Sequence, residues 1–540
     1  MPAAVPGAPA AASVPPSPFE RLGLPANLCQ QMNTSMPYMK NPTEAQQRLI
    51  PAILSPRDVI LRAHTGSGKS LAVLLSLLAK PRMLFRAGSA SARAGTSALI
   101  LVPSNELAWQ YVRWAQELMP ASLHGHLDAV LQCVVRGEST LETQVEHLRT
   151  HPPHIVVGTA TRVQEILALP QGKHILGVPT LRTLVLDEAD ALLQLPGRFP
   201  SEKQKWKHLA HRSAGLDVLN TLMRSRPTFS GGERIMNAGL ERGQHTRATE
   251  RRPPERIRRT QYRGVERTDL APPLPHEPGM TPLQLVCTSA TANSVLRHFF
   301  GARTGWLRTN TRETRGLATW IDLTGMSGRL SEVDVPMMGA MPREITHTCV
   351  VVDEGPAASP VFRPLAPERG APRALASTPP TTKPLPEHEV DTVLLEALAY
   401  IYAAEGIRRG LALIPARWSV RRVHDELASL GVSVRIIQPG DAMPVQEEDE
   451  VLYLLQSTSA RGLDVPALSH VFLLGLAAVQ DAVHYTHAAG RVSRLGATSP
   501  TSRPPGHVVT LLRGDATSES KMARIYARVH ITPRALDLRT

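Results

Sequence analysis

A chain of 540 residues is too long for one hydrophobic core, so we expect two compact domains with insertions. The hydrophobic fraction of 42% lets most of the chain fold, and no apolar run approaches the roughly 18 residues of a membrane-spanning helix. The net charge of +13 favours a polyanionic partner, although 51 of the 60 basic residues are Arg, a bias that genome composition also produces. The four cysteines lack a CxxC pair, which argues against a zinc site or disulfides and indicates a reducing compartment.

The N-terminal segment is rich in Pro and Ala, and we expect residues 1–17 to be disordered. Its first twenty residues contain neither Lys nor Arg, unlike an Arg-rich transit peptide. Either no cleaved signal exists, or this start codon lies downstream of one.

Buried strands alternate with helices through the first part of the chain, and we predict a parallel sheet in a domain of residues 18–310. The strand candidates are 58–63, 97–103, 154–159, 183–188 and 283–291.

The same alternation resumes later and predicts a second α/β domain at 345–515. Its strand candidates are 345–353, 411–416, 432–437, 451–457, 471–476 and 507–512. We expect an interdomain linker at 311–344 and a helical tail at 516–540.

Two segments interrupt this order. Residues 224–267 hold twelve Arg and five Glu with few large apolar residues, so we expect an Arg-rich insertion at about 224–280. It is either a solvated surface insertion or an arm that binds nucleic acid. Residues 354–388 contain nine prolines and predict an extended, largely unstructured excursion.

The stretch "AHTGSGKS" follows a strand and opens a helix, which is the context of a phosphate-binding loop. Gly66 and Gly68 let backbone N–H groups crowd around phosphate oxygens. Lys69 would neutralise the β- and γ-phosphates, and the Ser70 hydroxyl would bind Mg²⁺. Ala63 stands where the strict pattern has Gly. The loop predicted to bind nucleotide comprises Ala63, His64, Thr65, Gly66, Ser67, Gly68, Lys69 and Ser70.

The stretch "LDEAD" (186–190) ends a predicted strand, where one carboxylate can reach Mg²⁺ and its neighbour can handle water. With "TSAT" (288–291), "SARGLD" (459–464) and "HAAGRVSR" (487–494) downstream, the chain resembles the DEAD-box RNA helicases from Phe19 to about 515. The resemblance implies an α/β fold of two tandem RecA-like domains, each a mostly parallel sheet flanked by helices. It also implies an RNA-dependent ATPase with ATP and Mg²⁺ as cofactors.

The resemblance implies roles for further residues. It assigns nucleotide contacts to Phe19, Gln46 of "PTEAQ" (42–46) and Asp464, a Mg²⁺ contact through water to Asp187, and activation of water to Glu188. It assigns interdomain coupling to Asp190, Ser289, Thr291 and His487.

Arg491 and Arg494 lie three residues apart with no acidic residue nearby in the sequence. By resemblance they are arginine fingers for the γ-phosphate held by the other domain. Phosphoryl transfer needs positioned cations, and placing them on a separate domain makes hydrolysis depend on closure.

The RNA-contact motifs of the family are only partly matched. By resemblance we assign RNA contacts to Gly158, Thr159 and Arg162 of "GTATR", and to Arg461. Asn105 stands where the family usually has Arg.

Further departures lie in both domains. Ala488 replaces another Arg, Gln456 and Ser457 stand at a usual Thr-Asp, Gly137 is the remainder of a glycine pair, and no QxxR element is clear before Val451. We infer an intact ATPase with a modified grip on RNA.

Insertions and variant motifs are similar to those of the fungal mitochondrial DEAD-box helicases. That similarity implies ribosomal RNA and the large mitochondrial ribosomal subunit as partners of a monomeric, membrane-free protein of the mitochondrial matrix. A nuclear or nucleolar ribosome-assembly helicase, and an ATP-gated RNA clamp without productive unwinding, stay open as alternatives. A DNA-directed motor is disfavoured by "PTEAQ" and the DEAD spelling.

Overall fold

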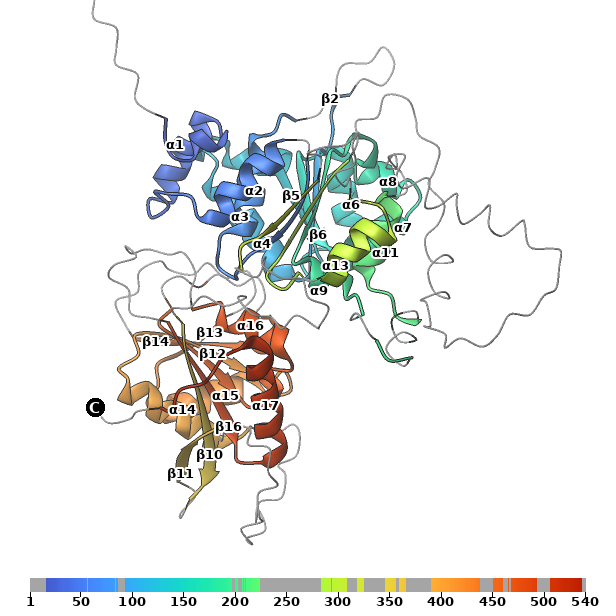
Figure 1. Cartoon of the computed structure of the whole chain (residues 1–540). Helices are drawn as coiled ribbons and strands as arrows, with labels where there is room; N and C mark the ends of the chain where they lie inside the picture. Colours follow the sequence, from blue (N-terminus) through green and yellow to red (C-terminus); the bar gives the residue numbers. More distant parts are fainter. Residues whose placement is uncertain are drawn as a thin grey trace, which may run out of the picture.

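The computed structural model contains two α/β units, shown in Figure 1 with the first in blue to yellow-green and the second in gold to red. It describes residues 16–55, 57–82, 84–85, 93–196, 200–202, 206, 208, 210–223, 283–292, 294–307, 318–324, 345–355, 359–365, 390–437, 450–459, 465, 468–492 and 506–536.

The first sheet has seven strands in the order β5-β6-β4-β7-β8-β1-β9, and every neighbouring pair is parallel. Five of these strands are buried along their whole length and are mostly apolar, as expected of a sheet covered on both faces. The strands are β1 Asp58–Arg62, β4 Ala98–Val102, β5 Leu131–Val134, β6 Ile155–Thr159, β7 Thr183–Asp187, β8 Gln284–Ser289 and β9 Ala318–Asp322. A small hairpin of β2 Leu84–Phe85 and β3 Arg93–Ala94 lies apart from it.

Helices cover both faces of this sheet. One apolar cluster joins it to α1 Ala26–Ser35, α2 Glu44–Leu54, α3 Lys69–Ala79 and α4 Asn105–Glu117. A second cluster on the other face includes α6 Leu141–Thr150, α7 Ala160–Ala168, α8 Gly172–Ile175, α9 Ala189–Leu193, α11 Ala214–Met223 and α13 Ser294–His298. The short helices η1 Glu20–Leu22, η2 Ala121–His126, α5 Leu127–Val130, η3 Val178–Thr180 and the π-helix η4 Phe299–Arg303 complete this domain.

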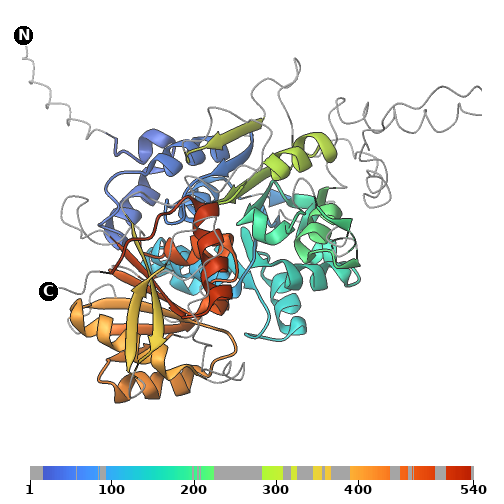
Figure 2. The ribbon, with the colours of Figure 1, turned by 60° about the horizontal axis from the view of Figure 1, so that its bottom comes forward.

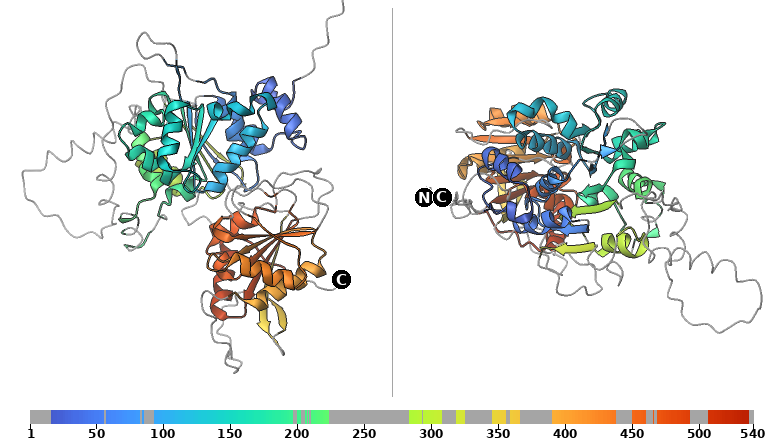
Figure 3. Two further views of the ribbon diagram at one scale, coloured as in Figure 1. Left: turned by 180° about the vertical axis from the view of Figure 1, so that it is seen from behind. Right: turned by 90° about the horizontal axis from the view of Figure 1, so that it is seen from above.

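The second sheet has the order β11-β10-β16-β15-β12-β14-β13, and only the β10–β11 pair is antiparallel. Its strands are β10 Thr346–Glu354, β11 Pro360–Pro364, β12 Arg409–Ile414, β13 Val434–Ile436, β14 Val451–Gln456, β15 His470–Leu474 and β16 His507–Arg513. Helices α14 Thr392–Ala404 and α15 Val420–Ser429 cover one face, and α16 Ala482–Ala489 and α17 Ala516–Val529 cover the other (Figure 3, left). Two short turns, η6 Ser457–Ser459 and η7 Leu476–Ala478, follow β14 and β15.

The predicted fold class is confirmed, because both sheets are mostly parallel and flanked by helices. The structure differs from the expected domain limits in two places, and the C-terminal segment is helical as expected. Residues 318–322 of the expected linker form β9, which pairs with β1 in the first sheet. Residues 360–364 of the Pro-rich excursion form the edge strand β11, where proline is tolerated because one side of the strand has no hydrogen-bonding neighbour. The expected tail contains α17, which buries Met522 and Tyr526 in the second domain's core.

The two domains meet along the carboxyl-terminal edge of the first sheet, where α9 follows β7 and α16 approaches from below (Figures 1 and 2). A Cβ atom on Gly490, just after α16, would lie 1.6 Å from Thr65 Oγ1 in the loop that follows β1. Only glycine fits at this approach of the second domain to the first. None of the helices that the structure describes is long and apolar enough to cross a membrane.

Candidate active site between the two domains

A pocket lies at this edge and takes its walls from both domains. Its lining includes ten of the residues predicted from the sequence: Gln46, Thr65, Gly66, Gly68, Lys69, Ser70, Asp187, Glu188, His487 and Arg491. The first eight belong to the first domain, and the last two come from α16 and the turn after it. The structure therefore brings together motifs more than 400 residues apart.

The loop between β1 and α3 has the backbone of a phosphate-binding turn. Gly66 and Gly68 have φ values of 76° and 77°, in the left-handed region that favours glycine. Gly68 is the N-cap of α3, so the positive end of the helix dipole points toward the pocket. The Lys69 ammonium donates hydrogen bonds to the carbonyls of Ala63, at 2.9 Å, and His64.

These hydrogen bonds hold the Lys69 side chain against its own loop. The free volume of the pocket is about 100 Å³, below the roughly 300–1,000 Å³ of typical ligand pockets. In this structure the Lys69 ammonium is directed at the loop's own carbonyls, beside the N–H groups at the start of α3.

The segment before α2 is tied to the loop. Thr43 and Gln46 form a capping box, in which Gln46 N donates to Thr43 Oγ1 and Thr43 N donates to Gln46 Oε1. Thr43 Oγ1 also donates to the Ser67 carbonyl at 2.7 Å. A Cβ on Gly68 would lie 2.6 Å from Gln46 Nε2, so this amide packs directly against the loop.

Asp187, at the end of β7, is buried and held by several donors. Tyr111 Oη donates to Oδ2 at 2.8 Å, Thr288 Oγ1 donates to Oδ1 at 2.5 Å, and the Glu188 backbone N–H donates to Oδ1 at 3.1 Å. Burial raises the pKa of Asp187, against the hydrogen bonds from Ser70 and Thr288 that lower it. The contact with Ser70 places a hydroxyl and a carboxylate together, a pair of oxygen ligands that suits Mg²⁺.

Glu188 adopts a left-handed backbone with φ 55° and ψ 53°, which costs a non-glycine residue about 1–3 kcal/mol. It is the N-cap of α9, and its Oε1 lies 3.6 Å from Nδ1 of His487 in the other domain. A strained backbone that aims a carboxylate into a pocket is typical of catalytic positions.

Asp190 connects the acidic segment to the end of β8. Ser289 Oγ donates to Oδ1 at 2.5 Å, Thr291 Oγ1 donates to Oδ2, and the Thr291 backbone N–H donates to Ser289 Oγ at 2.9 Å. The three residues form one network directly behind the pocket. The structure thus joins three of the four residues assigned to coupling.

Several buried polar atoms at the pocket have no hydrogen-bond partner within the part of the chain that the structure describes. They are Gln46 Nε2, Thr65 Oγ1, Gln110 Nε2, Glu188 Oε2 and both ring nitrogens of His487. Buried polar groups are nearly always paired. A cluster of such atoms beside Lys69 fits a ligand with both anionic and polar edges, and a nucleoside triphosphate has both.

Not every predicted residue reaches the pocket. Phe19 lies in the core cluster of the first domain, 1% exposed, and does not line the pocket. Its assignment to the nucleotide stays a prediction. Tyr38, four residues before Pro42, lines the pocket instead. Gln110 and Trp114 of α4 were also missed as lining residues, as was Tyr111 as a partner of Asp187. Arg461, Asp464 and Arg494 lie outside the described residues.

The residues assigned to RNA contacts in the first domain are buried. Gly158 lies inside β6, where an added Cβ would be 2.6 Å from the Val134 carbonyl. Thr159 and Arg162 are each 7% exposed. The Arg162 guanidinium donates to the carbonyl of Ser139 at 2.9 Å and to Glu165 at 3.0 Å. In this structure these residues hold the loop after β5.

The variant positions also bond to the protein. Asn105 Nδ2 donates to the Arg136 carbonyl at 2.9 Å, beside Gly137. Gln456 Nε2 donates to the carbonyls of Ala416 and Trp418. Ala488 is buried at 6% exposure. None of these three side chains adds a positive charge to the surface.

Comparison with known proteins places the first domain in a family. Residues 43–223 match the DEAD/DEAH box helicase family model. The DEAD-box ATP-dependent RNA helicase 47A of Oryza sativa subsp. japonica is 36% identical over 211 residues, or 38% of this chain and 35% of that protein. The mitochondrial DEAD-box ATP-dependent RNA helicase 47 of Arabidopsis thaliana is 36% identical over 180 residues, 32% of this chain and 31% of that protein. The match thus spans about a third of the curated relatives' length.

Solved structures extend the fold likeness to both domains. S. cerevisiae Dbp5 bound to RNA and ADP BeF3 aligns with a TM-score of 0.53 at 17% identity, over 97% of this chain and 96% of that one. Mss116p bound to ssRNA and AMP-PNP aligns with a TM-score of 0.55 at 15% identity, over 96% and 78%. At such identities the likeness concerns the fold alone. The sequence match to the DEAD/DEAH box helicases covers residues 43–223, within the first domain.

Proposed function

We propose that the chain is an ATP-dependent RNA helicase, which hydrolyses ATP to unwind short RNA duplexes or to remodel ribonucleoprotein. One observation supports this above the others: the pocket is completed only when the second domain supplies His487 and Arg491 opposite Lys69 and Glu188. A site that needs both domains makes hydrolysis depend on closure. RNA that binds across both domains would favour that closure.

The residues present fit ATP and Mg²⁺. Lys69 and the N–H groups at the start of α3 would hold the β- and γ-phosphates, and Ser70 and Asp187 would hold the metal ion. Bound Mg²⁺ supplies charge neutralisation on the phosphates. Gln46 has a buried amide available for the adenine edge.

Water activation and charge stabilisation fall to different domains. Glu188 Oε2 has no hydrogen-bond partner among the described residues, so it can orient a water and accept its proton. Arg491 lines the same pocket and would stabilise the charge that develops on the γ-phosphate. We assign Arg494 to the same task, Asp464 to the ribose and Arg461 to RNA.

The substitution Glu188→Gln tests this function. It keeps the shape of the side chain but removes the base, so RNA-stimulated phosphate release should fall by about 10²–10⁴-fold. Binding of ATP, measured by fluorescence of a labelled analogue, should persist. Glu142→Gln, on the exposed side of α6, is the matched control and should keep the wild-type rate. An equal rate in both variants would contradict the proposal.

A second candidate is an ATP-gated RNA clamp without productive unwinding. The uncharged positions Gln456 and Ala488 favour it, because their side chains bond to or pack against the protein itself. A clamp would release phosphate at the same negligible rate in wild type and Glu188→Gln, yet would hold RNA in the presence of a non-hydrolysable analogue. RNA retention with no difference in rate would therefore favour the clamp over the helicase.

We further propose that the protein acts as a monomer on ribosomal RNA during assembly of the large mitochondrial ribosomal subunit. The relative from Arabidopsis thaliana is named mitochondrial, which supports the compartment. The ATP-dependent rRNA helicase spb4 of Schizosaccharomyces pombe, 35% identical over 159 residues (29% of this chain, 24% of that protein), supports the RNA class and leaves a nuclear or nucleolar site as the alternative. Crosslinking and sequencing of bound RNA from cells reports both RNA and compartment. Recovery of pre-ribosomal nuclear RNA alone would overturn the mitochondrial assignment.

A further inference from the structure

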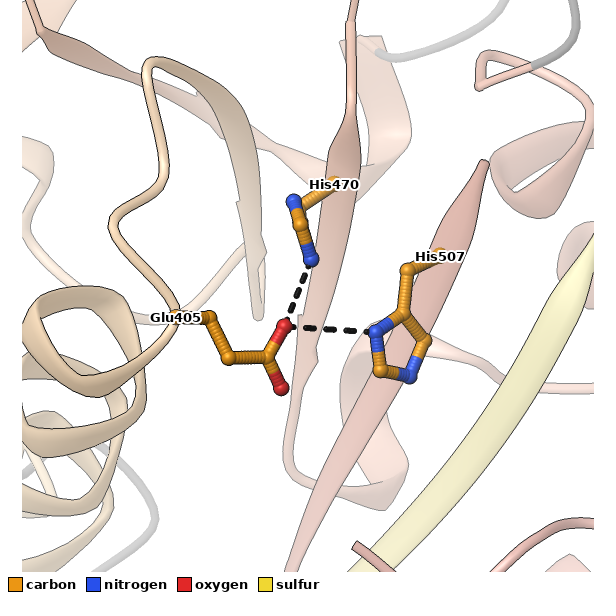
Figure 4. A group of neighbouring side chains, drawn as sticks. All are labelled: Glu405, His470 and His507. Atoms are coloured by element: carbon orange, nitrogen blue, oxygen red, sulfur yellow. Dashed lines mark hydrogen bonds and ion pairs between the residues drawn. The ribbon is translucent and has the colours of Figure 1, made fainter. Parts of the chain in front are cut away.

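A cluster of three metal-binding side chains lies on the second domain, away from the pocket. It consists of Glu405 at the end of α14, His470 at the start of β15 and His507 at the start of β16 (Figure 4). His470 and His507 are paired across the parallel strands, so their rings leave the sheet on the same face. The cluster is at the amino-terminal edge of this sheet, whereas α16 and the pocket follow its carboxyl-terminal edge.

The three side chains point at one spot. Nε2 of His470 lies 2.7 Å from Oε2 of Glu405, and Nδ1 of His507 lies 3.4 Å from the same oxygen. One candidate ligand atom from each residue lies within 4.8 Å of the others. The side chains are 14–22% exposed, so the spot is largely shielded but can be reached from solvent.

The hydrogen bonds around His470 determine which of its ring nitrogens carries the proton. Ser469 Oγ donates its proton to the Arg409 carbonyl at 3.0 Å. The same oxygen lies 2.9 Å from Nδ1 of His470 and must therefore accept a hydrogen bond from it. A neutral His470 then presents the lone pair of Nε2 to a carboxylate oxygen at 2.7 Å. Two lone pairs at that distance repel, so a positive charge has to lie between them, carried either by a second proton or by a metal ion.

The surroundings of both rings favour the metal ion. His507 Nε2 lies 2.7 Å from Thr348 Oγ1, so each ring has its outer nitrogen at a hydroxyl and its inner nitrogen toward Glu405. Metal-binding histidines are held in this way by partners on their far nitrogen. One proton satisfies a single N···O contact, whereas one cation satisfies three ligands at once. Zinc ligands at ~2.0–2.2 Å lie roughly 3.3 Å apart in a tetrahedron, so His470 and Glu405 need to separate by only about half an ångström.

We propose that Glu405, His470 and His507 bind a divalent transition-metal ion, with Zn²⁺ the best match to two imidazoles and a carboxylate. The fourth position is open to water. The ion would join the end of α14 to the first residues of β15 and β16 and stabilise the second domain without touching the nucleotide pocket. Because the ligands come from distant parts of the chain, no short sequence motif predicts the site.

The test uses the full chain stripped of metal and titrated with ZnCl2 in the absence of nucleotide. Competition with a chromophoric chelator should give one tight equivalent of Zn²⁺ per chain, and the thermal midpoint should rise with added Zn²⁺. The substitution H507Q should abolish both effects. The matched control H147Q changes an exposed histidine 3.3 Å from Asp128 in the first domain and should abolish neither.

A second measurement decides the matter even if H507Q fails to fold. Wild-type protein loaded with Co²⁺ should show the intense visible bands of four-coordinate cobalt. The proposal is overturned if Zn²⁺ leaves the thermal midpoint unchanged and the cobalt spectrum is that of the hexa-aqua ion. It is also overturned if H507Q retains the tight equivalent. In either case, ¹⁵N spectra showing a doubly protonated His470 would assign the charge to a proton.

Discussion

The nucleotide pocket and the region of β5, β6 and α7 both lie in the first domain, but their polar groups behave in opposite ways. In the pocket, Gln46, Gln110 and Glu188 each keep a buried polar atom without a partner among the described residues. In the β5–β6–α7 region, Arg162 bonds to Ser139, Val135 and Glu165. The first arrangement costs folding free energy unless a ligand completes it, and the second stabilises the fold by itself.

The difference separates motif residues that line the pocket from motif residues that hold the surrounding protein together. Family resemblance assigned both groups to ligands: Lys69 and Glu188 to ATP, and Gly158 and Arg162 to RNA. The structure separates them, because only the first group lines a pocket. Under the proposed function, RNA would contact groups that the loop after β5 exposes, while Arg162 holds that loop through the Val135 and Ser139 carbonyls.

The largest expected effect comes from Arg491→Ala. If this guanidinium stabilises the transition state from the second domain, RNA-stimulated phosphate release should fall by about 10³–10⁵-fold. Because Arg491 belongs to the second domain, ATP binding to the first domain should change little. Arg421→Ala, on the exposed face of α15, is the matched control in the same domain. A rate within tenfold of wild type would remove Arg491 from the mechanism.

In the β5–β6–α7 region, Gly158→Ala should lower stability. An added Cβ would lie 2.4 Å from a methyl group of Val134 and 2.6 Å from its backbone carbonyl, and overpacking of this kind costs about 1–3 kcal/mol. Gly125→Ala is the control, since a Cβ there meets nothing within 4 Å. Denaturant unfolding measures the loss. If Gly158→Ala kept its stability but lost RNA affinity, the contrast between the two regions would fail.

Tyr111→Phe should have a smaller effect, confined to the pocket. The substitution removes the hydroxyl that donates to Asp187 and favours its ionised form. Burial already raises the pKa of Asp187, and loss of this donor raises it further, so more of the carboxyl is protonated at a given pH. The acidic limb of kcat/KM should move to higher pH, with a rate loss of roughly tenfold at neutral pH, as expected for a hydrogen bond to a charged group.

The control for that experiment is Tyr402→Phe. Tyr402 is buried in the second domain, and its hydroxyl has no hydrogen-bond partner within the described residues. Its removal should leave the pH profile unchanged. A profile that shifts equally in both variants would indicate a general loss of stability rather than a role in positioning Asp187.

Strands and site residues could be predicted from the sequence where a continuous stretch of residues carries the pattern. Buried parallel strands such as β4 and β7 are continuous apolar runs, so their positions were predicted to within a residue or two. The edge strands β5, β9 and β11 are short or contain polar residues and proline, and their pairing depends on neighbours distant in sequence. Lys69 and Glu188 were likewise predicted because each belongs to a motif of consecutive residues, and both line the pocket.

Residues whose role depends on tertiary contact were missed. Tyr111 is an ordinary aromatic residue on α4 until the fold places it against Asp187. The cluster of Glu405 and His470, 65 residues apart, has no local pattern either. Sequence motifs thus reveal groups that neighbouring residues present together, and they miss groups that only the fold assembles.

Asn105→Arg should have the smallest effect. It tests the comparison of the two regions by adding a positive charge next to the β5–β6–α7 region instead of removing a group. Asn105 holds the Arg136 carbonyl at the first turn of α4, close to the loop that Arg162 supports. If the absence of a cation at this position lowers RNA affinity, arginine here should strengthen RNA binding several-fold and steepen the dependence of log K on log salt by about 0.7 for one added phosphate contact. Asn105→Gln adds no charge and should leave the slope unchanged. Equal slopes in the two variants, measured by fluorescence anisotropy across a salt series, would mean that RNA phosphates do not reach α4.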